Sequence, residues 1–142
     1  MNIGIGCDHA AFTEKELLIS YLKDSGHSVI DFGCNSSDSV DYPDYAHALS
    51  EELINKKINM GILICGSGIG ISIAANKNRG IRAALCCTTF HAEMSRKHND
   101  ANVIAFGARA TDIKTMYRMT DIFLNTKFEG GRHQTRIDKI EK

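Results

Sequence analysis

Two kinds of hydrophobic pattern alternate along the chain. Short runs of consecutive apolar residues predict strands that are buried on both faces, and segments whose apolar residues recur every three or four positions predict amphipathic helices. The expected strands lie at residues 3–8, 28–32, 61–65, 81–86 and 101–106. Helices are expected between them and after the last one, including residues 89–97, 111–125 and 132–142. This alternation implies right-handed crossovers and a parallel sheet with helices on both faces, which is an α/β fold.

Local signals indicate where some helices begin. Thr13 and Glu16 have the spacing of a capping box, which predicts a helix start at this point. Pro43 follows Tyr42 and fits the first turn of the second helix. Glu129-Gly-Gly131 is expected to break the chain before the last helix.

The third strand and the turn after it form the stretch around which the chain is organised. The apolar run 61–65 is followed by Gly-Ser-Gly-Ile-Gly at residues 66–70 and then by a helical pattern. Glycines allow several backbone N–H groups to point at one spot, and the start of a helix adds partial positive charge. Cys65 ends the strand at the edge of this concavity. The pattern therefore favours a nucleophile or base beside a group of backbone N–H donors that can bind an oxyanion. The structural alternative is a glycine-rich turn next to an inert cysteine.

In such a sheet, ligands bind beyond the carboxyl ends of the strands. Asp8 and His9 follow the first strand, where a carboxylate can accept from a substrate hydroxyl and an imidazole can donate to a phosphate or hydroxyl. They can equally cap the strand. Likewise His98-Asn99-Asp100, placed in the loop before the fifth strand, can be either functional or a polar turn.

Two arginines, Arg132 and Arg136, share one face of the last expected helix. Such a pair is usually solvated, but two guanidinium groups that converge on one point bind a phosphate dianion. Arg109, after the fifth strand, could join them. The other histidines, among them His133, have no partner that the sequence identifies, and we expect them on the surface or in the core.

Composition and charge exclude several classes of protein. The 142 residues suit one domain, residues 1–142, that buries roughly two-thirds of its unfolded surface. With 17 basic and 17 acidic residues, no nucleic-acid or membrane partner is expected. No apolar run approaches the ~20 residues of a membrane span, and the N-terminus begins a strand rather than a signal peptide. Five cysteines without a CxxC pair fit reduced thiols in a cytoplasm, and neither a zinc site nor a disulfide framework is expected.

Nucleotide-binding fingerprints are incomplete. The third glycine of a dinucleotide fingerprint that starts at Gly4-Ile-Gly6 would fall on His9, and the loop at residues 66–70 has the wrong spacing. A P-loop is excluded because no Gly-Lys-Ser or Gly-Lys-Thr occurs.

A series of motifs in a fixed order resembles type-B ribose-5-phosphate isomerase, a family that also contains the subunits of galactose-6-phosphate isomerase. The resemblance extends from Ile3 to Arg136, and the ordered set is far more specific than any single motif. The motifs are Gly6-Cys-Asp-His9, Asp41-Tyr-Pro43, Cys65-Gly-Ser-Gly-Ile-Gly-Ile-Ser-Ile-Ala-Ala-Asn-Lys77, Gly80-Ile-Arg82, Arg96-Lys-His-Asn-Asp-Ala-Asn-Val103, Ala105-Phe-Gly-Ala-Arg109 and Phe128-Glu-Gly-Gly-Arg-His133.

This resemblance implies a Rossmann-like three-layer sandwich with a five-stranded parallel sheet. It also implies a homodimer, possibly a dimer of dimers, whose active sites lie at the subunit interface and are built from both chains, with the C-terminal helix packed on the partner. The family interconverts D-ribose 5-phosphate and D-ribulose 5-phosphate through a cis-enediolate, as part of the pentose phosphate pathway, with no metal and no cofactor.

The resemblance also assigns catalytic roles. Cys65 matches the base that moves the proton between C2 and C1, and Ser67 stands where many members have threonine. His98 matches the residue that helps to open the furanose ring. In another branch of the family the base is a glutamate one position after Gly70. Here that position is Ile71, which leaves Cys65 as the only base candidate in the loop.

Substrate-binding roles follow in the same way. The amides that hold the enediolate oxygen match Gly66, Gly68 and Gly70. The groups around the phosphate match His9, Arg109, Arg132 and Arg136. The groups that line the sugar match Asp8, Tyr42 and Asn99. Two alternatives stay open, namely an isomerase of a hexose 6-phosphate such as allose or galactose 6-phosphate, and a non-catalytic sugar-phosphate binding module.

Overall fold

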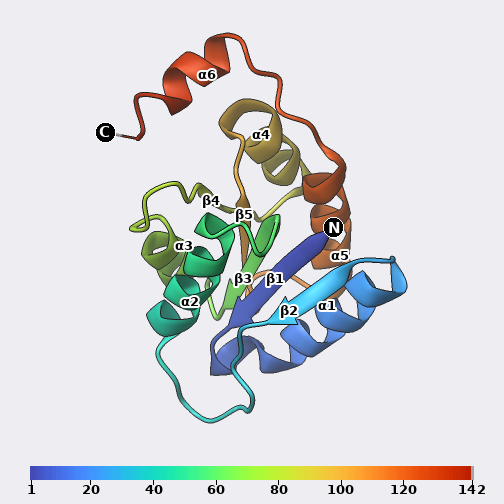
Figure 1. The fold of residues 1–142 in the computed structure, drawn as a ribbon. Coiled ribbons are helices and arrows are strands. Elements are labelled where there is room, and N and C mark those ends of the chain that lie inside the picture. The colour runs from blue at the N-terminus through green and yellow to red at the C-terminus, as the bar shows by residue number, and fades with distance from the viewer. Residues whose placement is uncertain (142) are drawn as a thin grey trace.

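A computed structural model describes residues 1–141 and contains one sheet of five parallel strands (Figure 1). The strand order is β2-β1-β3-β5-β4, and every neighbouring pair is parallel, so the carboxyl ends of all strands lie at one edge. The strands are β1 (Asn2–Cys7), β2 (Ser28–Asp31), β3 (Met60–Cys65), β4 (Ala83–Leu85) and β5 (Val103–Gly107). The expected α/β fold with a five-stranded parallel sheet is confirmed.

Helices cover both faces of this sheet. One core cluster joins the sheet to α1, α4 and α5, and a second joins the opposite face to α2 and α3, which gives three layers. The helices are α1 (Phe12–Asp24), α2 (Tyr42–Ile54), α3 (Ile69–Ala75), α4 (Thr89–Asn99), α5 (Ile113–Asn125) and α6 (Arg132–Ile137), with a short 3-10 helix, η1 (His9–Ala11). Within residues 1–141, no helix combines the length and the apolar character needed to cross a bilayer.

Alternating side chains of β3 explain why its sequence is a continuous apolar run. Ile62 and Ile64 belong to the cluster under α1 and α5, whereas Leu63 and Cys65 belong to the cluster under α2 and α3. Both faces of the strand are therefore buried, as expected for a central parallel strand. The alternation also directs the side chain of Cys65 toward the α2 and α3 face.

Several expected boundaries were wrong, including those of the first helix, the fourth strand and the last helix. Thr13 lies inside α1 and makes no cap, because the Asp8 carboxylate accepts from the Ala10 amide at 3.0 Å and starts the 3-10 turn η1 before the helix. The fourth strand covers only Ala83–Leu85, so Cys86 lies after it. The last helix ends at Ile137 rather than at residue 142, since its only buried side chains are His133 and Ile137.

Candidate active site

Cys65 and the glycine-rich loop after β3 are in direct contact. The Gly68 amide donates to Sγ of Cys65 at 3.1 Å, and the Cys65 side chain is 4% exposed. Gly68 has φ +77°, and a Cβ at this position would lie 2.5 Å from Cδ1 of Leu85 and 2.7 Å from the backbone carbon of Phe106. Only glycine fits both the left-handed conformation and the space. The sulfur thus lies at the base of the loop and faces one of its amides.

The rest of the loop is fixed by the end of β5. A Cβ on Gly107 would lie 2.5 Å from the carbonyl oxygen of Ser67, so the loop rests directly on that strand end. The Ser67 hydroxyl accepts from the Ile69 amide at 3.2 Å, and the residue is exposed. Ser67 therefore presents its side chain at the mouth of the loop.

Arg109 and Tyr42 approach the loop from two sides. The Arg109 amide donates to the Gly66 carbonyl at 3.0 Å, and a Cβ on Gly66 would lie 3.0 Å from Nη1 of Arg109. A Cβ on Gly70 would lie 2.5 Å from Cζ of Tyr42, at the start of α2. The two glycines make room for a guanidinium and a phenol beside the loop.

Asp8 and His9 lie next to this loop because β1 and β3 are neighbours in the sheet. The Asp8 amide donates to the Ile64 carbonyl at 3.2 Å, and Asp8 is 7% exposed. The Val40 amide donates to Nδ1 of His9 at 3.2 Å. In neutral His9 the ring proton is therefore on Nε2, which can donate to an anion or hydroxyl.

Four other predicted site residues lie at the opposite edge of the sheet. His98 was expected in a loop, but it lies in the last turn of α4, which ends where Asp100 pairs with Arg96 at 2.8 Å. Because α4 leads from the carboxyl end of β4 to the start of β5, its last residues, His98 and Asn99, reach the amino edge. The Arg82 side chain, just before β4, lies 3.2 Å from the Asp100 carboxylate, in agreement with this position.

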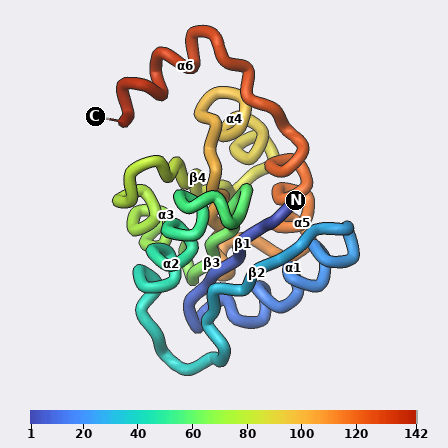
Figure 2. The backbone as a smooth tube through the Cα atoms, viewed as in Figure 1, coloured from blue at the N-terminus to red at the C-terminus, as the bar shows by residue number. Residues whose placement is uncertain are grey.

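Arg132 and Arg136 lie on α6, which packs against α4 on the side where the strands begin (Figures 1 and 2). Both side chains are exposed. The structure therefore brings Cys65, Ser67, the three loop glycines, Asp8, His9, Tyr42 and Arg109 together. It does not bring His98, Asn99, Arg132 and Arg136 to them within one chain.

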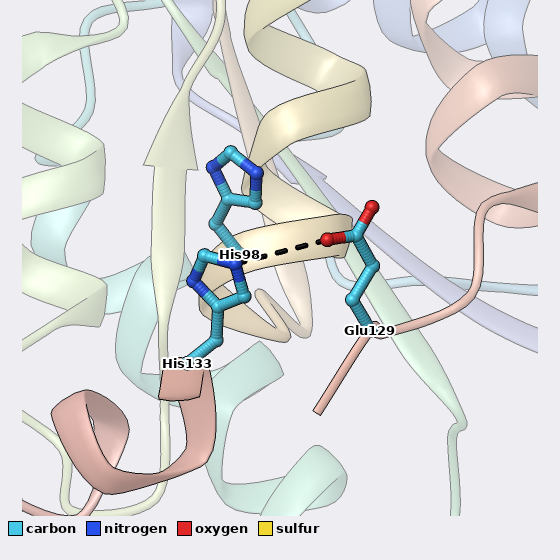
Figure 3. A group of neighbouring side chains, drawn as sticks. All are labelled: His98, Glu129 and His133. Atoms are coloured by element: carbon cyan, nitrogen blue, oxygen red, sulfur yellow. Dashed lines mark ion pairs between the residues drawn. The ribbon is translucent and has the colours of Figure 1, made fainter. Parts of the chain in front are cut away.

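A cluster that the sequence did not indicate surrounds His98. The rings of His98 and His133 stack at 4.3 Å with an interplanar angle of 10°, and Oε2 of Glu129 lies 3.7 Å from Nε2 of His133 (Figure 3). Burial lowers the pKa of His133, and its neighbours His98, Arg132 and Arg136 lower that pKa further. No helical spacing signalled this pair, because Glu129 lies before Gly130 and Gly131 and α6 begins only at Arg132.

Three other cysteines, Cys7, Cys34 and Cys86, are buried. Sγ of Cys7 lies 3.6 Å from Sγ of Cys34 in the core, and burial raises the pKa of Cys7. Burial also raises the pKa of Cys86 to about 12. The thiols of Cys7 and Cys86 therefore stay protonated at neutral pH and act as small apolar core residues.

Comparisons with known proteins agree with this geometry. A model of the family described as Ribose/Galactose Isomerase matches residues 3–140. The chain belongs to this family. It is 45% identical over 138 residues to ribose-5-phosphate isomerase B of Escherichia coli K12, covering 97% of this chain and 93% of that protein. It is 48% identical over 140 residues to a putative sugar phosphate isomerase of Rickettsia bellii, covering 99% of this chain and 97% of that protein.

Solved structures of Ribose/Galactose Isomerase relatives have the same fold. That of ribose-5-phosphate isomerase B from Clostridium thermocellum superposes with a TM-score of 0.98 at 47% identity, covering 99% of this chain and 95% of that one. The structure of the ribose 5-phosphate isomerase from Thermotoga maritima superposes with a TM-score of 0.97 at 46% identity. The match covers 99% of this chain and 97% of that one. The position of the glycine-rich loop beside Cys65 thus belongs to a fold shared with these isomerases.

A cavity of about 510 Å³ lies away from the loop, on the amino side of the sheet. It is bounded by the segment after α3, the start of β4, the end of α4 and residues near the C-terminus, and its lining includes Arg82, Asn99 and Glu141. Asn99 is the only predicted site residue among its lining residues, so this cavity does not include Cys65 or the glycine-rich loop.

Proposed function

We propose that this chain interconverts D-ribose 5-phosphate and D-ribulose 5-phosphate through a cis-enediolate. The observation that carries the proposal is the hydrogen bond from the Gly68 amide to Sγ of Cys65. This contact places a candidate base beside the backbone N–H donors of the loop that follows β3. The similarity to ribose-5-phosphate isomerase B of Escherichia coli over nearly the whole chain supports the choice of substrate.

The chemistry requires a base within reach of a carbon-bound hydrogen and donors aimed at a developing oxyanion. The Cys65 thiolate takes the proton from C2 of the open-chain aldose and becomes a thiol, while the negative charge moves onto the carbonyl oxygen at C1. The loop amides of residues 66–70 and the Ser67 hydroxyl stabilise that oxygen. The thiol then returns the proton to C1, and transfer of a proton between the two oxygens completes the ketose.

Substrate recognition divides between the phosphate and the sugar. His9 donates through Nε2 to the phosphate, and the guanidinium of Arg109 neutralises its charge. Asp8 and Tyr42 line the sugar beside the loop. The phosphate does not react, so its binding energy fixes the sugar for the proton transfer.

The remaining groups come from a second copy of this chain. His98, Asn99, Arg132 and Arg136 lie at the far edge of their own sheet, so a homodimer that shares its active sites is the arrangement that unites them with Cys65. In that dimer His98 opens the furanose ring, Asn99 contacts the sugar, and the two arginines bind the phosphate. The exposed apolar side chains of Ile69, Ile73 and Phe90, each more than half exposed, support burial of this region by a partner.

We also propose a cytoplasmic location and keep one alternative class of substrate. Five free cysteines within the described residues support a reducing cytoplasm. The family description also names galactose, which keeps a hexose 6-phosphate as the alternative substrate.

The deciding experiment compares turnover of ribose 5-phosphate with that of allose 6-phosphate and galactose 6-phosphate by the purified full-length chain. We expect the highest kcat/KM for ribose 5-phosphate. A higher kcat/KM for a hexose phosphate would move the proposal to that substrate, and binding of all three without turnover would reject an isomerase.

A further inference from the structure

The proposed isomerase reaction leaves Glu129 and His133 without a role, although they lie against His98. His133 is 5% exposed, His98 is half-buried and Glu129 is exposed. One ligand atom from each residue lies within 4.8 Å of the other two (Figure 3). Three side chains from the end of α4, the segment before α6 and α6 itself therefore lie close together.

We propose that His98, Glu129 and His133 form a binding site for a divalent transition-metal ion, with zinc as the reference ion. Two imidazoles and one carboxylate are a common ligand set for Zn²⁺ when a further position is open to water. The set contains no second carboxylate, so it does not suit Mg²⁺ or Ca²⁺, which prefer oxygen ligands.

Metal binding requires a modest rearrangement of the cluster. Bond lengths of about 2.0–2.1 Å from zinc to nitrogen require the ligand atoms to approach one another more closely than they do here. The stacked rings present their nitrogen lone pairs side by side rather than toward a common centre. His133 is buried in α6, whereas His98 at a helix end and Glu129 before Gly130 have freedom to turn. We therefore expect the metal to pull the His98 ring out of the stack.

Charges near the cluster limit which ions it retains. The Glu129 carboxylate is the single negative ligand, and Arg132 and Arg136 flank His133 on α6. These guanidiniums repel any cation, so only ions with a high intrinsic affinity for imidazole, such as Zn²⁺, Ni²⁺ or Cu²⁺, have enough bonding energy to bind.

Occupation of the site has a functional consequence, which rests on the proposed isomerase activity. A metal bound to the His98 nitrogen removes the lone pair with which this residue accepts a proton during ring opening. Zinc therefore inhibits turnover of the cyclic sugar phosphate by binding His98 at the end of α4 rather than by blocking the Cys65 thiol.

The binding test uses isothermal titration of the metal-stripped full-length protein with Zn²⁺, in a Cys87→Ser background that removes the exposed thiol. We expect one ion per chain and a loss of affinity of about ten-fold or more in His133→Gln and in Glu129→Gln, since even outer-shell partners contribute that much. Glu129 is exposed, so its variant reports on the site even if the His133 variant folds poorly. His47→Gln, which removes an exposed histidine outside the cluster, is the matched control and should bind as the background does.

Co²⁺ provides the second readout. A spectrum without a sulfur-to-cobalt charge-transfer band supports the cluster, whereas such a band would assign the ion to a cysteine and overturn the site. Equal affinity in His133→Gln, Glu129→Gln and the background would also overturn it.

Activity separates this inference from the proposed function. We expect Zn²⁺ to inhibit the background protein and to inhibit Glu129→Gln at concentrations about ten-fold higher or more. Binding at the cluster without inhibition would overturn the proposed effect on His98. A metal-free protein with no isomerase activity would overturn the proposed function, and the binding result would still decide the site.

Discussion

The Gly68 amide donates a hydrogen bond to Sγ of Cys65 at 3.1 Å, across the turn that joins β3 to α3. The amide that holds the sulfur therefore belongs to the loop that, in the proposed reaction, stabilises the enediolate. An N–H donor stabilises a thiolate more than a thiol, since hydrogen bonds to a charged acceptor are the stronger ones. One backbone geometry thus serves both the base and the intermediate.

Replacing Cys65 tests the base directly. Cys65→Ala should lower kcat for ribose 5-phosphate by about 10²–10⁴-fold, the range typical of general acid–base groups. The fold should persist, because the lost side chain is small and lies at the end of its strand. Steady-state kinetics with circular dichroism measures both effects. Cys87→Ala, at an exposed cysteine, is the control and should keep wild-type turnover; a comparable rate in Cys65→Ala would remove the thiol from the mechanism.

Substitution of Gly68 tests the geometry of the loop. Gly68→Ala places a methyl group 2.5 Å from Leu85 and 2.7 Å from the backbone of Phe106, so the loop must shift away from Cys65. We expect kcat to fall by about ten-fold or more, because a small misplacement of catalytic groups has large effects on rate.

Gly26→Ala is the matched control for this variant. Gly26 has φ +85° but no atom within 4 Å of an added Cβ, so its substitution carries only the backbone cost of about 1–2 kcal/mol in stability. Thermal unfolding and kcat should show stability loss in both variants and rate loss only in Gly68→Ala. A similar rate loss in Gly26→Ala would attribute the effect to general destabilisation.

Mixed dimers test whether the active site is shared. In the proposed homodimer, Cys65→Ala and His98→Ala each disable both sites, but a mixed dimer of the two variants retains one intact site. Random pairing after co-expression should restore about a quarter of the wild-type activity, since half of the dimers are mixed and each has one of two sites intact. Absence of any recovery, with mixed dimers verified by mass spectrometry, would place all the catalytic groups in one chain.

The C-terminal arginines should affect substrate binding. Loss of one charged hydrogen-bonding partner costs about 1.5–3 kcal/mol, so Arg132→Ala should raise KM for the sugar phosphate by about 10–100-fold. Arg118→Ala, at an exposed arginine on α5, is the control and should leave KM unchanged. An unchanged KM in Arg132→Ala would place the phosphate at other residues.

Lys15 should contribute to stability because its buried ammonium pairs with a carboxylate at the surface. Its side chain is 1% exposed, and Nζ donates to the Asp31 carboxylate at 2.6 Å and to the Cys34 carbonyl at 2.8 Å. Lys15→Met leaves both acceptors without this donor and should lower the free energy of unfolding by about 1–3 kcal/mol. Urea unfolding measures the difference, and Lys23→Met, exposed on the same helix, should cost far less.

The pH dependence of that difference has a definite sign. Burial acts to lower the pKa of Lys15, but hydrogen bonds from the ammonium to Asp31 and Glu16 outweigh it and raise the pKa above the ordinary value of 10.5. A raised pKa in the folded state stabilises the protein fully below the unfolded pKa. The advantage over Lys15→Met should therefore be constant near neutral pH and decline as the pH rises above 10.5. A decline that began near pH 8 would contradict the raised pKa.

Part of the candidate site was predictable because it depends on local order along the chain. The run 61–65 followed by glycines predicted a buried strand, a tight turn and a thiol at their junction, since these depend only on residues adjacent in sequence. Strand polarity also implied that residues before the fifth strand lie at the amino edge. By that rule His98, just before the fifth strand, lies at the opposite edge of the sheet from Cys65.

The sequence alone determined the alternation of strands and helices, the parallel sheet and the position of Cys65 beside its loop, because hydrophobic period and glycine spacing act over a few residues. Only the tertiary structure decided that Arg109 lies over Gly66, that Tyr42 packs on Gly70, and that His133 stacks on His98. These contacts join segments that are distant along the chain, and they depend on how each crossover returns to the sheet and where α6 packs on α4. No local periodicity encodes that packing.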